Sequence, residues 1–152
     1  MPQFKLKDGR ELEFLDNGIN SDSAIIFHHG TPGHASTWTD WLDAAASAGI
    51  RALSYSRAGY GTSDRNSGRS VISINGDVAQ LLDAKGITSF VSIGWSGGGP
   101  HSIATTFEAR NRGAISIAGV GAFGFDDLNF LEGMGPENHD EFGAAMKGEA
   151  VI

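Results

Sequence analysis

A five-residue segment carries the strongest chemical signal in this sequence. It consists of Gly94-Trp95-Ser96-Gly97-Gly98, in which glycines stand two positions before and two positions after a serine. A serine hydroxyl can act as a nucleophile when a sharp turn lifts it clear of its own backbone, and glycines let neighbouring chain approach such a turn. The pattern predicts that Ser96 is the nucleophile of an acyl-transfer reaction. The N–H of Gly97 would then stabilise the oxyanion that forms.

A second motif, His29-Gly30-Thr31-Pro32-Gly33, directly follows a short apolar run. An oxyanion needs more than one preorganised donor, and this loop is the expected source of the second. Pro32 cannot donate a backbone hydrogen bond, but it favours an extended conformation at Thr31 that can aim the Thr31 N–H inward. We therefore predict Thr31 as the donor, with His29, Gly30, Pro32 and Gly33 shaping the loop. The alternative is an ordinary strand-to-helix turn.

The general base is harder to find. A serine nucleophile normally needs a histidine that a carboxylate orients. Each of the five histidines has a more ordinary expected role, namely loop shaping, helix packing or solvent exposure (His28, His29, His34, His101 and His139). Asp126 and Asp127 follow the last predicted strand, where a carboxylate pair more often begins a helix or faces water. None of the five histidines makes a convincing base.

Apolar patterning predicts the elements that must position both motifs. An Asp8-Gly9 turn between the alternating segments 4–7 and 10–15 predicts a β-hairpin. Short apolar runs predict strands at 24–27, 50–55, 87–93 and 114–120, and helical spacing predicts helices at 36–48, 74–84 and 97–110. This alternation predicts an α/β fold with a mostly parallel sheet and helices on both faces. Residues 121–152 break the pattern, as a cap segment or a frayed terminus would.

Composition limits the class of protein. The 152 residues carry 11 Lys and Arg against 18 Asp and Glu, a formal net charge of −7, with 40% apolar residues and no cysteine. The absence of cysteine excludes disulfides and thiolate metal sites, and neither a metal nor an organic cofactor is implied. No basic cluster indicates nucleic acid or a membrane as a partner, and no signal-like segment is present. A cytoplasmic protein with a small-molecule or peptide substrate is the expectation.

Three segments together resemble the α/β-hydrolase fold enzymes, in particular the branch of esterases, proline-iminopeptidase-like and haloperoxidase-like enzymes. They are HHGTPG at 28–33, SRAGYGTSD at 56–64 and GWSGGGP at 94–100. The resemblance implies that the first is the oxyanion loop and the third the nucleophile elbow. The middle segment is similar to a structural loop written D-R-x-G-x-G-x-S, with Ser56 in place of the usual aspartate. Epoxide hydrolases share the HGTPG string but use an aspartate nucleophile, so Ser96 favours ester, amide or related acyl chemistry.

The resemblance also implies a domain organisation. Residues 1–122 correspond to the N-terminal half of the hydrolase core and residues 123–152 to the start of a cap. We therefore expect the C-terminal half, with the catalytic Asp and His, beyond residue 152, in the same or a separate chain. The 152 residues alone would then be inactive, with an apolar strand edge open at 114–120.

Two further alternatives stay open at this stage. Trp38, Trp95 and Phe123 are candidates to line an acyl or leaving-group pocket, although aromatic residues near a core more often pack inside it. The alternative to a serine hydrolase is a non-catalytic, hydrolase-like protein that binds a small ligand or a partner at the same pocket.

Overall fold

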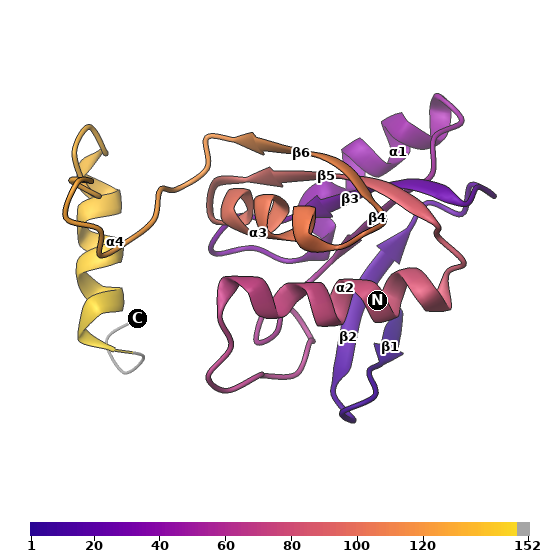
Figure 1. Ribbon diagram of the computed structural model, residues 1–152, viewed down its shortest axis with the longest axis horizontal. Coiled ribbons are helices and arrows are strands. Elements are labelled where there is room, and N and C mark those ends of the chain that lie inside the picture. The colour runs from indigo at the N-terminus through magenta and orange to yellow at the C-terminus, as the bar shows by residue number, and fades with distance from the viewer. Residues whose placement is uncertain (149–152) are drawn as a thin grey trace. The chain divides into compact units, whose positions relative to one another are not determined.

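A six-stranded sheet forms the core of residues 1–120 (Figure 1). The structure, a computed structural model, describes residues 1–148. The strands are β1 (Gln3–Lys5), β2 (Glu11–Asp16), β3 (Ser23–His28), β4 (Ala52–Tyr55), β5 (Ser89–Trp95) and β6 (Asn111–Ile117). The helices are α1 (Thr39–Ser47), α2 (Ile74–Ala84), α3 (Gly99–Ala104) and α4 (Pro136–Lys147). Contacts divide the chain into two units, Met1–Val120 and Gly121–Ile152.

The sheet is mostly parallel, as predicted. Its strand order is β1-β2-β4-β3-β5-β6, and the four strands from β4 to β6 in this order run parallel. The hairpin of β1 and β2 joins antiparallel to β4. Gly9, with φ +94°, occupies the left-handed conformation that its turn requires and that glycine adopts without steric cost. The predicted hairpin and the predicted α/β class are both confirmed.

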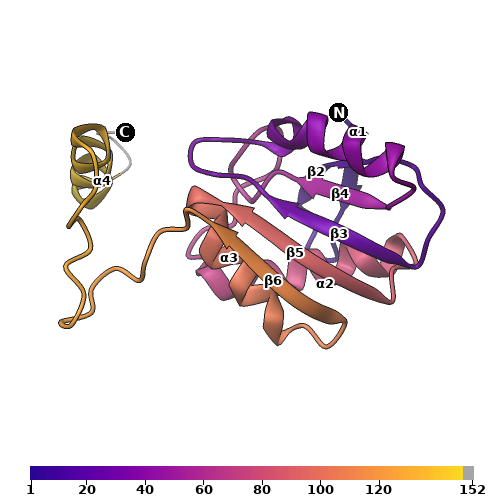
Figure 2. The same ribbon diagram turned by 90° about the horizontal axis from the view of Figure 1, so that it is seen from above.

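Helices cover both faces of the sheet (Figure 2). Successive side chains of a strand point to opposite faces, so apolar side chains lie on both. On one face, Phe27 of β3 and Ala52 of β4 pack in a cluster with Leu42 of α1. On the other face, Ile26 of β3 belongs to a larger cluster that includes the apolar side of α2. Each central strand is therefore buried on both faces, as expected for parallel strands between helices.

The strand order places the two sequence motifs side by side. β4 lies on one side of β3 and β5 lies on the other, and the connections through α1 and α2 cover opposite faces. The strand order thus reverses at β3, and open α/β sheets bind ligands at the carboxyl ends of strands at such a point. The segments that follow β3 and β5 there are the 29–33 and 94–98 motifs.

The predicted helix over 97–110 is wrong in its extent. α3 covers only Gly99–Ala104, a 3₁₀ turn follows at Thr105–Phe107, and β6 begins at Asn111 rather than at 114. The hydroxyls of Ser102, Thr105 and Thr106 donate to carbonyls three residues earlier, which competes with continued helix. The Asn111 amide then donates to Ser92 and Thr105, which fixes where β6 starts.

The shorter helix also changes which side chains face the core. Ile103 and Phe107 are 54% and 80% exposed, whereas Ala104 is buried. Phe107 lies beyond the end of α3, because the chain leaves the α-helical path directly after Ala104.

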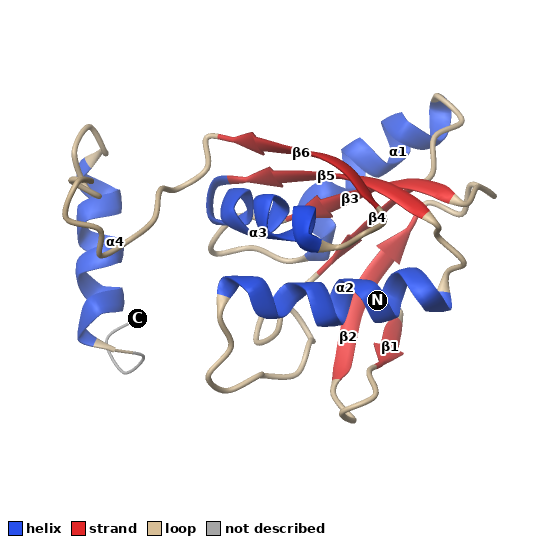
Figure 3. Cartoon of the chain, viewed as in Figure 1, coloured by secondary structure: helices blue, strands red, loops and turns tan. Residues whose placement is uncertain are grey.

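The second unit is small and contains α4 (Figure 3). Pro136 stands in its first turn, which suits a residue without a backbone N–H. Within this unit, the ring of Phe130 makes edge contacts with Phe123 and Phe142 at centroid distances of 5.3 Å and 4.9 Å. The unit boundary after Val120 lies two residues before the predicted boundary, and the role of the segment as a cap stays a prediction. No helix within residues 1–148 is long and apolar enough to span a membrane.

Leu82→Ala and Ile103→Ala test this distribution of buried side chains. Leu82 is fully buried beneath the sheet, so its truncation should lower the free energy of unfolding by about 2 to 5 kcal/mol. Ile103→Ala removes a similar volume from a mostly exposed position and should cost less than about 0.5 kcal/mol. Urea unfolding of both variants measures the difference. A large loss for Ile103→Ala would instead support the longer helix that the sequence predicted.

Candidate active site

Ser96 occupies a strained turn directly after β5. Its φ of +51° lies in the left-handed region, which a non-glycine residue adopts only at an energetic cost. A 3₁₀ turn covers Ser96–Gly98, and α3 begins at the next residue. The side chain is partly exposed. A strand, a strained serine and a helix therefore follow one another as the G-x-S-x-G pattern requires.

The flanking glycines let three pieces of backbone meet. A Cβ atom on Gly94 would overlap the carbonyl group of Gly98. A Cβ atom on Gly98 would overlap the carbonyl group of His28, at the end of β3. The turn after β5 is thus packed against the end of β3 at a distance that excludes side chains.

The 29–33 loop lies against the same turn. A Cβ atom on Gly30 would lie 2.9 Å from Cε3 of Trp95 and 3.4 Å from Cβ of Ser96. A Cβ atom on Gly97 would lie 2.5 Å from Oγ1 and 3.3 Å from the backbone nitrogen of Thr31. The Thr31–Pro32 peptide bond is cis. Ser96, Gly97 and Thr31, predicted as a nucleophile and two oxyanion donors, are therefore neighbours in space.

Arg57 holds the 29–33 loop from the end of β4. Its guanidinium donates to the carbonyl oxygens of His29 and Gly30, the latter at 3.0 Å, and to Oγ1 of Thr31 at 3.1 Å. Arg57 is almost completely buried, and burial lowers its pKa from the usual value. Arg57 was not among the residues predicted to form the site. The signal that could have indicated it is its position: it follows β4 as closely as the 29–33 loop follows the neighbouring strand β3.

His29 is committed to the loop and is not free to act as a base. Its Nε2 accepts from the backbone N–H of Arg57 at 3.0 Å, which leaves Nδ1 to donate to the carbonyl of Gly30 at 2.7 Å. Burial lowers the pKa of His29 to about 3, so the ring is neutral at neutral pH. The predicted role of His29 in shaping the loop agrees with these contacts.

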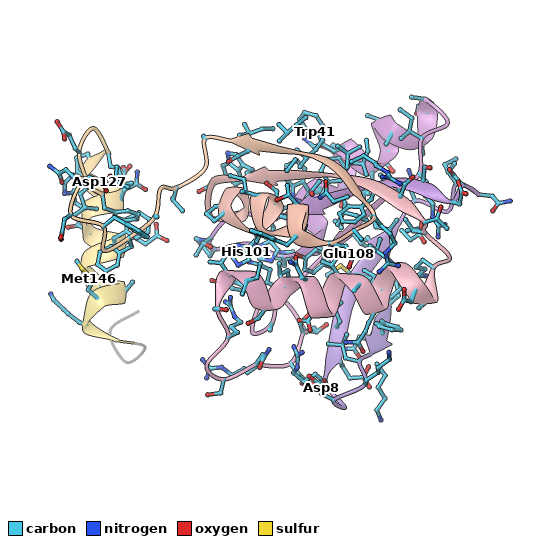
Figure 4. The ribbon with its side chains drawn as sticks, in the orientation of Figure 1. Asp8, Trp41, His101, Glu108, Asp127 and Met146 are labelled. Carbon is cyan, nitrogen blue, oxygen red and sulfur yellow. The ribbon has the colours of Figure 1, made fainter. Side chains whose placement is uncertain are left out.

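His101 is also held by backbone. Its Nδ1 lies 2.9 Å from the carbonyl oxygen of Gly97, and burial lowers its pKa to about 4. Figure 4 shows His101 on the side of α3 that faces α2, where it lines a small pocket with Arg57 and Arg69. The ring is therefore packed between two helices, as expected for a helix residue.

The buried His28 is hydrogen-bonded to the neighbouring strand β4. Nδ1 of His28 is 2.8 Å from the hydroxyl of Tyr55. The remaining histidines and the predicted carboxylate pair are exposed, with Asp127 visible in Figure 4 (His34, His139, Asp126 and Asp127). Within residues 1–120 no histidine nitrogen is hydrogen-bonded to the hydroxyl of Ser96. The same part of the chain contains no group of three or more His, Asp or Glu side chains that could hold a metal ion.

The predicted aromatic pocket is only partly consistent with the structure. Trp38 is 4% exposed and stacks on Phe27 with a centroid distance of 4.6 Å, so it belongs to the core beneath α1. Trp38 thus follows the alternative of packing inside the core, because the turn before α1 places its ring against Phe27 of β3. Trp95 is 45% exposed beside Gly30 and remains a candidate. Phe123 lies in the second unit.

Comparison with known proteins identifies the family. The model of the alpha/beta hydrolase fold matches residues 23–127. This chain therefore belongs to the α/β-hydrolase fold family.

Two curated relatives are similar to this chain in sequence. Over 143 residues the chain is 30% identical to a non-heme chloroperoxidase from Streptomyces lividans, and the match covers 91% of this chain and 52% of that protein. Over 103 residues it is 34% identical to an epoxide hydrolase from Caballeronia sordidicola, and the match covers 61% of this chain and 31% of that protein.

Among solved structures, an esterase from Exiguobacterium antarcticum superposes with a TM-score of 0.74 at 19% identity. The match covers 95% of this chain and 55% of the esterase, and it shows a shared fold. The chain spans about half the length of the chloroperoxidase, and less of the epoxide hydrolase.

Stability should fall as the pH is lowered below about 6.5. Burial depresses the pKa of His28, His29 and His101, whereas the unfolded chain binds the same protons near pH 6.5. Because the unfolded state then binds more protons, the contribution is complete above about pH 6.5 and is lost as the pH falls toward the folded pKa values. Urea unfolding at several pH values measures this slope.

The variant His29→Gln should make that slope shallower by about 1.4 kcal/mol per pH unit, the value for one proton. His139→Gln, on the exposed surface of α4, is the matched control for the substitution itself. An equal slope for His29→Gln and the unsubstituted chain would show that His29 binds protons alike in both states.

Proposed function

We propose that this chain provides the nucleophile and the oxyanion donors of a serine hydrolase acting on an ester, amide or related acyl substrate. The observation that carries the proposal is the left-handed conformation of Ser96, beside Gly97 and Thr31. A small molecule or a peptide is the expected substrate. Ser96 favours acyl chemistry over the epoxide opening named for one relative.

The chemistry follows from the arrangement of these groups. Oγ of Ser96 would attack the substrate carbonyl carbon while its proton passes to a general base. Negative charge would collect on the carbonyl oxygen, which would accept hydrogen bonds from the N–H groups of Thr31 and Gly97. Each such donor is worth roughly a hundredfold to a thousandfold in rate. The Arg57 contacts to the loop would keep the Thr31 donor in place before substrate binds.

We further propose that the base and its carboxylate come from polypeptide that covers the bare face of β5 and β6. Val91 and Trp95 of β5 and Ile115 and Ile117 of β6 expose 37%, 45%, 50% and 40% of their surfaces. The register pairs Trp95 with Ile117, so these side chains share one face, the face that α1 covers over β3 and β4. Since the relatives are about twice as long as the matched region, a further helix and strand of the hydrolase fold would fit here.

Labelling with a fluorophosphonate probe tests the nucleophile. In the intact protein that contains this chain, the probe should attach to Ser96 with one-to-one stoichiometry, and Ser96→Ala should abolish labelling. Ser70→Ala, at an exposed serine, is the control and should label normally. A folded intact protein that stays unlabelled and hydrolyses no aryl ester would instead support the alternative, a non-catalytic protein that binds a ligand at this pocket.

Self-association tests the bare face. The 152-residue chain alone should associate through β5 and β6, because unpaired apolar strands at a sheet edge pair readily with other chains. Ile115→Lys together with Ile117→Lys should restore a monomer, as measured by sedimentation velocity. Val71→Lys, at an exposed apolar side chain outside these strands, is the matched control. A monomeric unsubstituted chain at high concentration would contradict the proposed surface.

A further inference from the structure

A completely buried carboxylate stands next to the segment that carries Thr31. Glu13, on β2, has no exposed surface, and its backbone carbonyl accepts from the N–H of Ser56 at 2.9 Å. Oε1 accepts from the hydroxyl of Ser56 at 2.6 Å. Oε2 accepts from the N–H and the hydroxyl of Thr62 at 2.9 Å and 2.5 Å. Two neutral residues thus supply three hydrogen bonds to a buried acid.

These hydrogen bonds keep Glu13 charged. Burial by itself would raise its pKa, but the hydrogen bonds from Ser56 and Thr62 outweigh burial, and the pKa lies below its usual value. Burying a charge without sufficient hydrogen bonds is costly, so this arrangement is a specific feature of the chain. The absence of a side chain at Gly61 leaves room for the carboxylate, because a Cβ atom there would lie 2.5 Å from Oε1 of Glu13.

The charge fixes the orientation of the Ser56 hydroxyl, whose oxygen also binds the end of the oxyanion loop. Ser56 has a single hydroxyl proton, and an ionised carboxylate can only accept it. The oxygen of Ser56 is therefore left to accept from the backbone N–H of Ala35, at 2.8 Å. The carbonyl of Ala35 accepts from the hydroxyl of Ser54 at 2.9 Å. The end of β4 thus holds both backbone groups of Ala35.

The oxyanion loop is consequently held at both ends. Arg57 binds the carbonyls of His29 and Gly30 at its start, and Ser54 and Ser56 bind Ala35 just beyond its end. The segment between them has no regular secondary structure, and it includes the amide of Thr31. Its geometry depends on these side chains rather than on a hydrogen-bond ladder.

We infer that Glu13 is a positioning residue, which acts through Ser56 to hold Ala35 and so the oxyanion loop. In the resembling loop pattern a carboxylate stands at the position of Ser56. Here the carboxylate stands on the neighbouring strand instead, and the Ser56 hydroxyl transmits its effect. The inference rests on the proposed function for its catalytic consequence, but the hydrogen-bond relay can be tested without it.

Moving the carboxylate to position 56 tests the relay. Glu13→Gln removes the charge that holds the hydroxyl proton of Ser56 away from Ala35. The hydroxyl can then turn, its hydrogen bond from the Ala35 N–H weakens, and hydrogen exchange of the Ala35 amide should become about tenfold faster. Adding Ser56→Asp to Glu13→Gln places a carboxylate directly at the Ala35 N–H, with the side-chain amide introduced at position 13 as a donor. The double variant should return the exchange rate to within about threefold of the original, since one hydrogen bond is restored.

Two references separate a local effect from general destabilisation. The amide of Leu82, in the buried part of α2, reports on global unfolding. Its exchange rate should change only as much as the measured change in the free energy of unfolding requires. Glu11→Gln makes the same substitution two residues away on β2 and should leave Ala35 unaffected. If Glu13→Gln does not fold, Ser56→Ala removes the hydroxyl that joins Glu13 to Ala35 and should accelerate exchange of the Ala35 amide at least as much.

A catalytic readout then links the relay to function. In the intact, fully folded protein, Glu13→Gln should slow fluorophosphonate labelling of Ser96 roughly tenfold to a hundredfold. The double variant should restore the labelling rate. Unchanged exchange at Ala35 in Glu13→Gln, or a folded double variant without rescue, would overturn the inference. Absence of Ser96 labelling in the unsubstituted protein would overturn the proposed function, while the exchange measurement would still decide the relay.

Discussion

The candidate site depends on close contact between two pieces of backbone that have no side chains between them. The turn after β5 touches the end of β3 at Gly98, and its own two sides touch at Gly94. Side chains at these positions would push the strands' ends apart. Ser96 keeps its strained backbone conformation because the closely packed backbone around it holds the turn in place. This contact brings Gly97 and Thr31 together.

Around that contact, stability comes from neighbouring strands rather than from the site itself. The loop after β3 has no hydrogen-bond ladder, so side chains at the end of β4 satisfy its backbone groups. Arg57 and Glu13 are charged residues with almost no exposed surface, and such residues are costly unless they are well hydrogen-bonded. The protein maintains both charges beside the loop that carries Thr31. This cost is consistent with a preorganised site.

Some features followed from the sequence because they depend on local chemistry. The Asp8-Gly9 hairpin, the buried strands and the α/β class were all predictable from periodicity and turn residues. The extent of α3 was not, because Thr105 and Asn111 bond to Ser92, a residue on another strand. The sequence left two roles open for Trp38 for a similar reason, since its contact with Phe27 involves a strand and a helical turn that meet only in the folded chain.

The sequence by itself determined the chemistry that is available: a serine between glycines, a glycine-rich loop with one proline, and no thiol. The tertiary structure alone decided which groups meet. It placed Thr31 beside Gly97, enclosed Arg57 against the loop, and put the carboxylate of Glu13 beside Ser56, where the resembling pattern has an aspartate. The physical reason is that these contacts join residues of different strands, and their distances depend on strand order and register rather than on spacing along the chain.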